Sequence, residues 1–368
     1  MHYYIISGEL SGDLYGSHII RSLRELNSNS RFTGWGGPNM KSTGCNMVME
    51  LDALSFMGFW EVFKNIFLIA KNLSFAKKNI KESKPDAIIL IDYPGFNLRI
   101  AKYAHRLNIP VYWFIAPQLW AWKKNRINKL KKYVHRLFVA LPFELNYFQQ
   151  RGVSTFYFGH PLLDIINKQY DDKLKLLGKP IIVLLPGSRE QEIKRMLPLM
   201  LKVIKYFPNY RFVIICSENI SRTFYNDLVG EFNVELKFDK KILQLASGAL
   251  VTSGTATLEL ALYKIPQVVC YKLDYFSFLI ARFFIKIKYI SLVNILSKEC
   301  VVQELIQNDL NVNNIKNALS LVLQPSSKEV IIEKYNKLIS ELGESGSFDK
   351  LAQNIHSDLS RIKNHINI

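Results

Sequence analysis

The feature that most constrains the fold is a repeated order of segments. Short runs of β-branched, aromatic and other apolar residues are each followed by a Gly-, Pro- or Ser-containing loop and then by a helix-length segment. These runs occupy residues 3–7, 86–92, 110–116, 181–186 and 249–254. Strands that alternate with helices are typical of parallel sheets covered on both faces. The order therefore predicts an α/β protein built from doubly wound parallel sheets.

The length of 368 residues favours more than one domain. A polar, charged stretch at residues 167–179 separates two strand-loop-helix series of similar length. We predict a Rossmann-like domain at 1–166, a second at 167–310, and a helical tail at 311–368. The tail would pack back on the first domain or exchange between two copies. Since ligands bind beyond the carboxyl ends of parallel strands, the two loop sets would face one cleft.

The charge and cysteine content limit the partners and the compartment. Lys plus Arg less Asp plus Glu is 48 − 31 = +17, which favours polyanions or anionic membrane surfaces. The four cysteines form no CxxC pair, which fits a reducing compartment. The N-terminus has the pattern of a buried strand, and no apolar run approaches the ~20 residues of a membrane span. We expect a cytoplasmic chain that is soluble or lies on a membrane surface.

The first loop, SGELSGD, is a candidate binding loop. Gly8 and Gly12 flank Glu9 and Ser11 directly before a predicted helix, where backbone amides can approach an anion. Equally, Gly8 makes the turn and Ser11 or Asp13 caps the helix. The chain lacks GxGxxG and GxxxxGK[ST], which disfavours NAD and P-loop chemistry.

Two loops of the second half are candidates for binding a diphosphate. In LPGSRE, Gly187 and Ser188 allow a tight turn, and Arg189 offers a fork of donors to a phosphate. In SGTATLE, the small residues at 253–255 could present amides and hydroxyls, and Glu259 could accept from a ribose. The alternative is that Ser253 or Thr255 only caps the following helix.

Asp92 is the candidate general base. It ends an apolar strand and precedes Pro94, which we expect to delay the following helix. A turn or N-cap aspartate is the alternative. His160, in FGHP, is the best-placed histidine, and a loop-packing role is favoured for it. Neither HExxH nor DxD occurs, so a reaction without a metal is expected.

An aromatic stripe follows the first domain's early strands. Apolar residues recur at helical spacing in FMGFWEVFKNIFLIAKNL, with lysines beside them, and a second aromatic segment spans 275–288. Such stripes are usually buried helices, but beside cations they also fit an interfacial helix on anionic lipid.

Taken in order, the loops form a specific set. The stretches are SGELSGDLYG, GWGGPNM, FMGFWEV, IDYPGFN, PQLWAWKKNRI, LPFE, FGHPLLD, LLPGSREQEI, SGTATLE and ISLVN. In this order the chain resembles the lipid-A-disaccharide synthase family, inverting glycosyltransferases of the GT-B architecture, from residue 3 to about residue 306.

The resemblance implies a reaction and its partners. UDP-2,3-diacylglucosamine would donate its sugar to the 6-hydroxyl of 2,3-diacylglucosamine 1-phosphate (lipid X), giving a β-1,6 disaccharide 1-phosphate and UDP. It implies no cofactor, no metal and no nucleic acid. It also implies peripheral attachment to the cytoplasmic face of the inner membrane of a Gram-negative bacterium, and a homodimer that exchanges C-terminal segments.

The resemblance also assigns residues. Asp92 matches the base, Glu9 and Ser11 match first-loop positions near the reacting sugars, and Arg189 matches the arginine beside the departing diphosphate. The UDP-sugar set is Gly187, Ser188, Ser253, Gly254, Thr255, Glu259 and Asn294. The acyl and membrane patch is Met57, Phe59, Trp60, Val62, Phe63 and Ile66.

The chain departs from the family pattern at three positions, and two rival functions remain. Gly95 stands where an aspartate is usual, Leu10 replaces an alanine and Val293 a proline. One rival is another GT-B enzyme, the lipid-linked N-acetylglucosaminyltransferase of peptidoglycan synthesis, which would use UDP-N-acetylglucosamine. The other is a basic nucleic-acid-binding protein, but no RRM, KH or zinc-finger signature is present.

Overall fold

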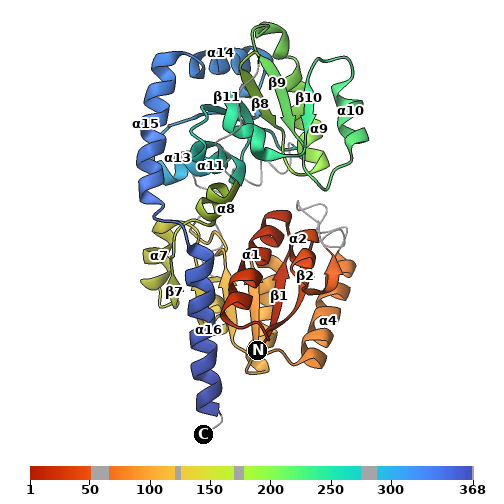
Figure 1. Cartoon of the computed structure of the whole chain (residues 1–368), viewed down its shortest axis with the longest axis vertical. Helices are drawn as coiled ribbons and strands as arrows, with labels where there is room; N and C mark the ends of the chain where they lie inside the picture. Colours follow the sequence, from red (N-terminus) through yellow and green to blue (C-terminus); the bar gives the residue numbers. More distant parts are fainter. Residues whose placement is uncertain (51–65, 121–125, 170–177, 275–287, 367–368) are drawn as a thin grey trace. The chain divides into compact units, whose positions relative to one another are not determined.

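The chain folds as two compact units. The computed structural model describes residues 1–50, 66–120, 126–169, 178–274 and 288–366. The first unit comprises Met1–Asp164 and Leu342–Ile368, and the second comprises Ile165–Glu341. The predicted boundaries gave each domain one continuous stretch, whereas the first unit also takes the end of the chain. The predicted α/β class is confirmed, since both sheets are wholly parallel (Figure 1).

The first unit contains a seven-stranded sheet in the order β3-β2-β1-β4-β5-β6-β7. Its strands are β1 (His2–Ser7), β2 (Arg31–Gly36), β3 (Asn46–Glu50), β4 (Ala87–Ile91), β5 (Val111–Phe114), β6 (Arg136–Phe138) and β7 (Thr155–Phe156). Its helices are α1 (Leu10–Leu26), α2 (Pro38–Ser42), α4 (Ile66–Ser83), α5 (Pro94–Arg106), α6 (Ile127–Tyr133), α7 (Pro142–Gln149) and α16 (Ser347–Ile366), and α8 (Pro161–Gln169) crosses the unit boundary.

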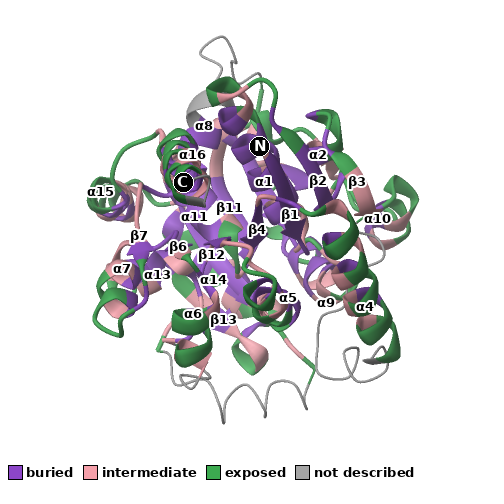
Figure 2. Cartoon of the chain, turned by 90° about the horizontal axis from the view of Figure 1, so that it is seen from below, coloured by how far each residue is buried: buried purple, intermediate pink, exposed green. Residues whose placement is uncertain are grey.

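The sheet of the first unit is buried on both faces, as its continuous apolar strands predict. Tyr4, Ile88 and Trp113 lie on one face and pack in the cluster that includes α4, α5 and α6. On the other face, Phe114 contacts Tyr15 of α1, with ring centroids 6.0 Å apart. Figure 2 shows β1 and β4 as buried strands within this layer. Helices therefore cover both sides.

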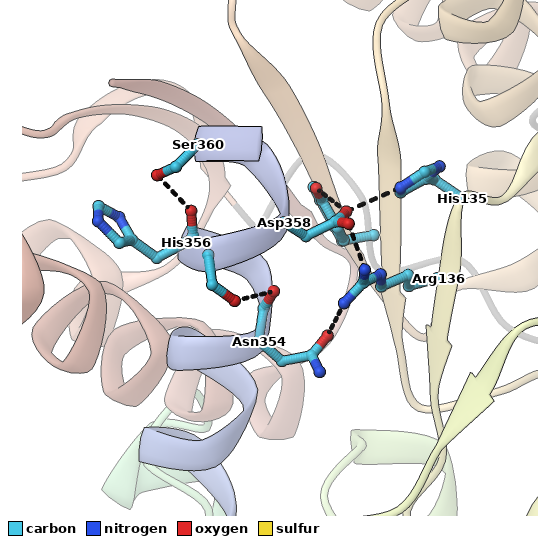
Figure 3. Close-up of polar contacts among 8 residues, drawn as sticks. His135, Arg136, Asn354, His356, Asp358 and Ser360 are labelled. Carbon is cyan, nitrogen blue, oxygen red and sulfur yellow. Dashed lines mark hydrogen bonds and ion pairs between the residues drawn. The ribbon is translucent and has the colours of Figure 1, made fainter. Parts of the chain in front are cut away.

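The terminal helix α16 is held to the first unit by a buried carboxylate. Asp358 accepts hydrogen bonds from the Tyr112 hydroxyl and His135 Nε2, each at 2.7 Å, and pairs with Arg136 (Figure 3). Arg136 also donates to Asn354 Oδ1 at 2.6 Å. These contacts join α16 to β5 and β6 within one chain. Exchange of this helix between two copies stays a prediction.

The second unit contains a six-stranded sheet in the order β10-β9-β8-β11-β12-β13. Its strands are β8 (Ile181–Leu185), β9 (Arg211–Ile215), β10 (Glu235–Lys237), β11 (Ala246–Thr252), β12 (Gln267–Tyr271) and β13 (Gln303–Ile306). Its helices are α9 (Glu190–Leu201), α10 (Arg222–Val229), α11 (Thr255–Leu262), α13 (Leu292–Ser297), α14 (Val312–Val322) and α15 (Pro325–Glu341), with short 3-10 turns at Ile204–Tyr206, Lys240–Leu245 and Gln307–Asp309.

Each sheet has one point where its strand order reverses. In the first unit β1 lies beside β4, with Ser7 aligned to Ile91. In the second unit β8 lies beside β11, with Leu185 aligned to Val251. Loops that leave the carboxyl ends of such strands diverge and open a crevice for ligands. Glu9, Ser11, Asp92 and the two candidate diphosphate loops follow these four strands, whereas Asn294 and the acyl patch do not.

Candidate active site

The loop after β1 places Glu9 at the start of α1. Glu9 is the N-cap residue, and no side chain caps the helix, so the alternative that Ser11 or Asp13 caps α1 is wrong. Asp13 instead serves another helix. Its Oδ1 accepts from the backbone amides of Gly37 at 2.7 Å and Met40 at 3.0 Å. The buried Asp13 therefore holds the start of α2, while Glu9 stays partly exposed.

The loop after β4 packs directly on the loop after β1. A Cβ at Gly8 would lie 2.4 Å from the Tyr93 ring, so only glycine fits there. Asp92 and Tyr93 both have left-handed backbones, with φ of 45° and 49°. Such conformations are strained for residues other than glycine and cluster at functional sites. Burial, and to a smaller extent the negative charge of Glu9, raises the pKa of the Tyr93 hydroxyl.

Asp92 is fixed through its backbone. Its amide donates to the Phe114 carbonyl at 3.0 Å, and Asn97 Nδ2 donates to its carbonyl at 2.7 Å. The expectation that Pro94 delays the helix is wrong, because α5 begins at Pro94. A proline is well tolerated at the first position of a helix, since the amide that it lacks would have no partner within the helix. Tyr93 is the N-cap residue of α5, so Asp92 is not that cap. Its half-buried carboxylate follows β4 at the strand-order reversal.

Sequence reasoning missed Glu144 of α7. Its side chain is 2% exposed, and its carboxylate accepts from Trp120 Nε1 at 2.9 Å and from the Leu141 amide at 3.3 Å. Burial, assisted by the charge of Asp92, raises the pKa of Glu144 to about 7. The only signal was its place in LPFE, where a glutamate three residues after the N-cap position can accept from the N-cap amide.

His160 is a packing residue. Burial lowers the pKa of its imidazole to about 3, so the ring is neutral. Its Nδ1 accepts from the Leu162 amide at 3.2 Å at the start of α8. The favoured loop-packing interpretation therefore agrees with the structure.

The loop after β8 turns at Gly187, whose φ is 126°, and Arg189 is the N-cap residue of α9. Arg189 Nη1 lies 3.0 Å from Glu192 Oε1, and the Ser188 amide donates to Glu192 Oε2 at 3.1 Å. Glu192 thus holds two donors that we expected to contact a phosphate. Sequence reasoning missed this carboxylate, although a spacing of three on a helix is a signal for such a pair.

The loop after β11 leaves its first helical turn open. Gly254 is the N-cap residue of α11 and no side chain caps the helix, so the alternative that Ser253 or Thr255 caps it is wrong. The Ser253 hydroxyl donates to the Ile290 carbonyl at 2.8 Å. Gly254 and Thr255 are exposed, and no atom lies within 4 Å of a Cβ built on Gly254. An anion could approach these amides closely.

Two buried residues of the predicted UDP-sugar set already have side-chain partners. Glu259 is 5% exposed and pairs with Lys240 Nζ at 2.8 Å, which leaves less of its carboxylate for a ribose. Asn294 is fully buried. Its amide nitrogen donates to Val302 O and Glu304 Oε1, and its oxygen accepts from the Val301 and Val302 amides. Asn294 therefore braces α13 against β13 in this structure.

The acyl patch falls largely outside the described residues. Met57, Phe59, Trp60, Val62 and Phe63 lie there, and Ile66 is described only by its place at the start of α4. The next residue, Phe67, is 86% exposed, and Leu68 is 39% exposed. Within the described part of the chain, no helix has both the length and the apolar character to cross a bilayer, and no three His, Cys, Asp or Glu side chains cluster as metal ligands.

Comparison with known proteins identifies the family. The model of the lipid-A-disaccharide synthetase family matches residues 3–356. The chain belongs to the lipid-A-disaccharide synthase family. It is 35% identical over 366 residues to the lipid-A-disaccharide synthase of Syntrophus aciditrophicus, with 95% of each chain covered. The enzyme of that name from Coxiella burnetii is 33% identical over 368 residues, covering 96% of this chain and 97% of the relative.

Solved structures support the GT-B fold of this family member. A glycosyltransferase of kitacinnamycin superposes with a TM-score of 0.66 at 14% identity, covering 97% of this chain and 99% of that chain. The UDP-GlcNAc 2-epimerase from Neisseria meningitidis gives 0.65 at 14% identity, covering 98% and 100%. At these identities the likeness establishes the fold alone. The residues of the site carry the functional argument.

Proposed function

We propose that the chain transfers 2,3-diacylglucosamine from UDP-2,3-diacylglucosamine to the 6-hydroxyl of lipid X, with inversion at the anomeric carbon. The family match over residues 3–356 carries this proposal. The arrangement of the two switch points supports it. Carboxylates follow β1 and β4 in the first unit, whereas glycines, hydroxyls and an arginine follow β8 and β11 in the second.

Asp92 acts as the general base in this proposal. Its carboxylate takes the proton of the acceptor 6-hydroxyl, and the oxygen forms a bond to the anomeric carbon. The bond from that carbon to the β-phosphate oxygen breaks at the same time, and UDP leaves as the anion. Glu9 and Ser11, on the neighbouring loop, would position the sugars. The backbone that holds Asp92 is anchored at Phe114 and Asn97, so the base is preorganised.

The second unit binds the donor in this proposal. Ser188, Arg189, Gly254 and Thr255 would hold the diphosphate, because backbone amides at helix starts and a guanidinium both favour negative charge. Glu192 now accepts from two of these donors. We infer that the diphosphate takes the place of the Glu192 carboxylate on binding. The buried Glu259 and Asn294 would stabilise the binding loops without contacting the diphosphate.

The first unit binds the acceptor and the membrane. The exposed Phe67 and Leu68 stand at the beginning of α4, directly after the predicted acyl patch. Exposed aromatic and aliphatic side chains in a chain of charge +17 fit attachment to an anionic bilayer. We propose peripheral binding to the cytoplasmic face of the inner membrane and assembly as a homodimer.

The test is a transferase assay with purified full-length protein, lipid X, nonionic detergent and EDTA. We expect disaccharide 1-phosphate from UDP-2,3-diacylglucosamine and negligible turnover of UDP-N-acetylglucosamine. The reverse donor preference would favour the rival N-acetylglucosaminyltransferase. Absence of product from either donor, beside an active control enzyme, would contradict the proposed reaction.

A further inference from the structure

A cationic hollow on the first unit has not been given a role in the proposed reaction. It lies between α5 and the start of α6 and has a volume of about 260 Å³. Its described lining residues are Pro94, Gly95, Leu98, Arg99, Lys102, Arg126, Lys129 and Tyr133. We call it the α5–α6 hollow. Four of these residues carry cationic side chains, and the described lining contains no carboxylate.

Three of the four cations of the α5–α6 hollow have no ion-pair partner among the described residues. Arg99, Lys102 and Lys129 are exposed and form no ion pair with another described residue. Burial, and the neighbouring charge of Arg99, lower the pKa of the Arg126 guanidinium. Like charges held this close repel one another, and a bound anion would relieve that repulsion. The hollow is thus prepared electrostatically for negative charge.

A second hollow continues the same charge toward α4. It has a volume of about 170 Å³ and shares Arg99 and Lys102 with the first. Lys77 and Arg106 add two more cations, and Leu73 and Tyr103 complete its described lining. Lys77 and Leu73 belong to α4, whose first turn carries the exposed Phe67. One helix therefore contributes both apolar and cationic surface, as an amphiphilic ligand requires.

Gly95 keeps the α5–α6 hollow open. It is exposed on the first turn of α5, and no atom lies within 4 Å of a Cβ built there. Arg99 donates to its carbonyl, which holds the guanidinium over the helix start. The amino end of a helix adds its own preference for negative charge. A carboxylate at position 95 would stand among the cations and compete with any anionic ligand.

We propose that the α5–α6 hollow binds the phosphate group of a lipid, through Arg99, Lys102, Arg126 and Lys129. α5 begins two residues after Asp92, so this phosphate would be held beside the candidate base. The phosphate comes either from the lipid X acceptor or from the head group of an anionic phospholipid at the membrane surface. The first source rests on the proposed function and the second does not.

The first test changes the charge of the hollow. The Arg99→Gln/Lys102→Gln variant removes two exposed cations, and Arg21→Gln/Lys350→Gln removes two exposed cations from α1 and α16 on the other face of the sheet. One arm measures the KM for lipid X in nonionic detergent without phospholipid. The other measures cosedimentation with phosphatidylcholine vesicles with and without phosphatidylglycerol. For the hollow variant only, we expect the KM for lipid X to rise, the affinity for phosphatidylglycerol vesicles to fall, or both, by about tenfold or more.

The second test keeps all four cations and adds a carboxylate. Gly95→Asp and Gly95→Asn are nearly equal in size, and open space receives either side chain. In one or both of the arms above, we expect the Asp variant to bind lipid X or phosphatidylglycerol vesicles about tenfold more weakly than the Asn variant. An acidic residue suits the first turn of a helix, so misfolding is not the expected cause of any loss.

The arms separate the two sources and the two proposals. A rise in KM alone assigns the hollow to the acceptor phosphate, and weaker binding to phosphatidylglycerol vesicles alone assigns it to head groups. If the wild-type protein lacks transferase activity, the vesicle arm still reads the hollow. Equal behaviour of the two double variants in every arm that gives a signal, together with equal behaviour of Gly95→Asp and Gly95→Asn, would overturn the proposal.

Discussion

The two units have the same strand order around their switch points and carry opposite chemistry there. In the first unit, carboxylates gather after the strands: Glu9 after β1, Asp92 after β4, and the buried Glu144 close enough to sense the charge of Asp92. In the second unit, the matching loops offer exposed amides, hydroxyls and Arg189. The scaffold fixes where ligands bind, and a few loop residues decide whether the site removes a proton or holds an anion.

The largest expected effect would break the first half of this comparison. Asp92→Asn keeps the shape of the side chain but removes the carboxylate that we propose as the base. We expect kcat to fall by roughly 10²–10⁴-fold, the usual contribution of a general base. Steady-state kinetics with both acylated substrates measures it. A variant with the wild-type kcat would exclude Asp92 as the base.

A second prediction concerns the buried carboxyl of the first unit. Because the pKa of Glu144 is raised to about 7, the folded state keeps a proton that the unfolded state loses above its ordinary value near 4.5. Stability from this group is therefore present at low pH and is lost as pH rises toward 7. For Glu144→Gln we expect the unfolding free energy, relative to wild type, to rise by about 3 kcal/mol between pH 4.5 and pH 8.

Tryptophan fluorescence can follow that unfolding transition in urea. All five tryptophans belong to the first half of the chain, between residues 35 and 122, so the signal reports the first unit. A difference between variant and wild type that does not change with pH would show that Glu144 has an ordinary pKa. In that case Glu144 would not add a protonated carboxyl group to the difference between the two switch points.

The third prediction sharpens the assignment of the membrane to the first unit. Phe67→Ser removes an aromatic ring that is 86% exposed on α4. Burial of such a side chain in lipid contributes about 1.5–3 kcal/mol, so vesicle affinity should fall by about tenfold or more. Phe232→Ser is the matched control, since Phe232 is 42% exposed in the second unit. Equal losses for the two variants would contradict this assignment.

The smallest expected effect concerns the second unit. Glu192→Gln removes the negative charge that now pairs with Arg189. Since such partly exposed pairs contribute only about 0.2–1 kcal/mol, we expect UDP to bind a few-fold more tightly. Isothermal titration with UDP measures the change. Weaker binding of UDP would show that Glu192 positions Arg189 and does not compete with the ligand.

Much of the fold was predictable from the sequence, because apolar strands and the polar loops that follow them can be recognised from the local order of residues. The position of Asp92 at a strand end followed from the same pattern. One error arose where a side chain bonds to a distant segment. Asp13 stands where a cap for α1 is expected, but its carboxylate accepts from the amides of Gly37 and Met40 at α2.

Other features required spatial information that local spacing lacks. The raised pKa of Glu144 depends on its burial and on the charge of Asp92, which is 52 positions earlier in the chain. The α5–α6 hollow joins cations from two helices, so no single motif contains it. By contrast, the pairing of Arg189 with Glu192 was visible in the sequence spacing and was overlooked.

The most direct test of the division between the units is UDP affinity, measured by isothermal titration for the wild type, Asp92→Asn and Arg189→Gln. We predict that Asp92→Asn binds UDP as the wild type does, because the proposed base belongs to the first unit and the proposed UDP site to the second. Arg189→Gln should bind it about tenfold or more weakly, since it removes a charge-assisted contact to the diphosphate. Loss of UDP affinity in Asp92→Asn with retention in Arg189→Gln would contradict the account.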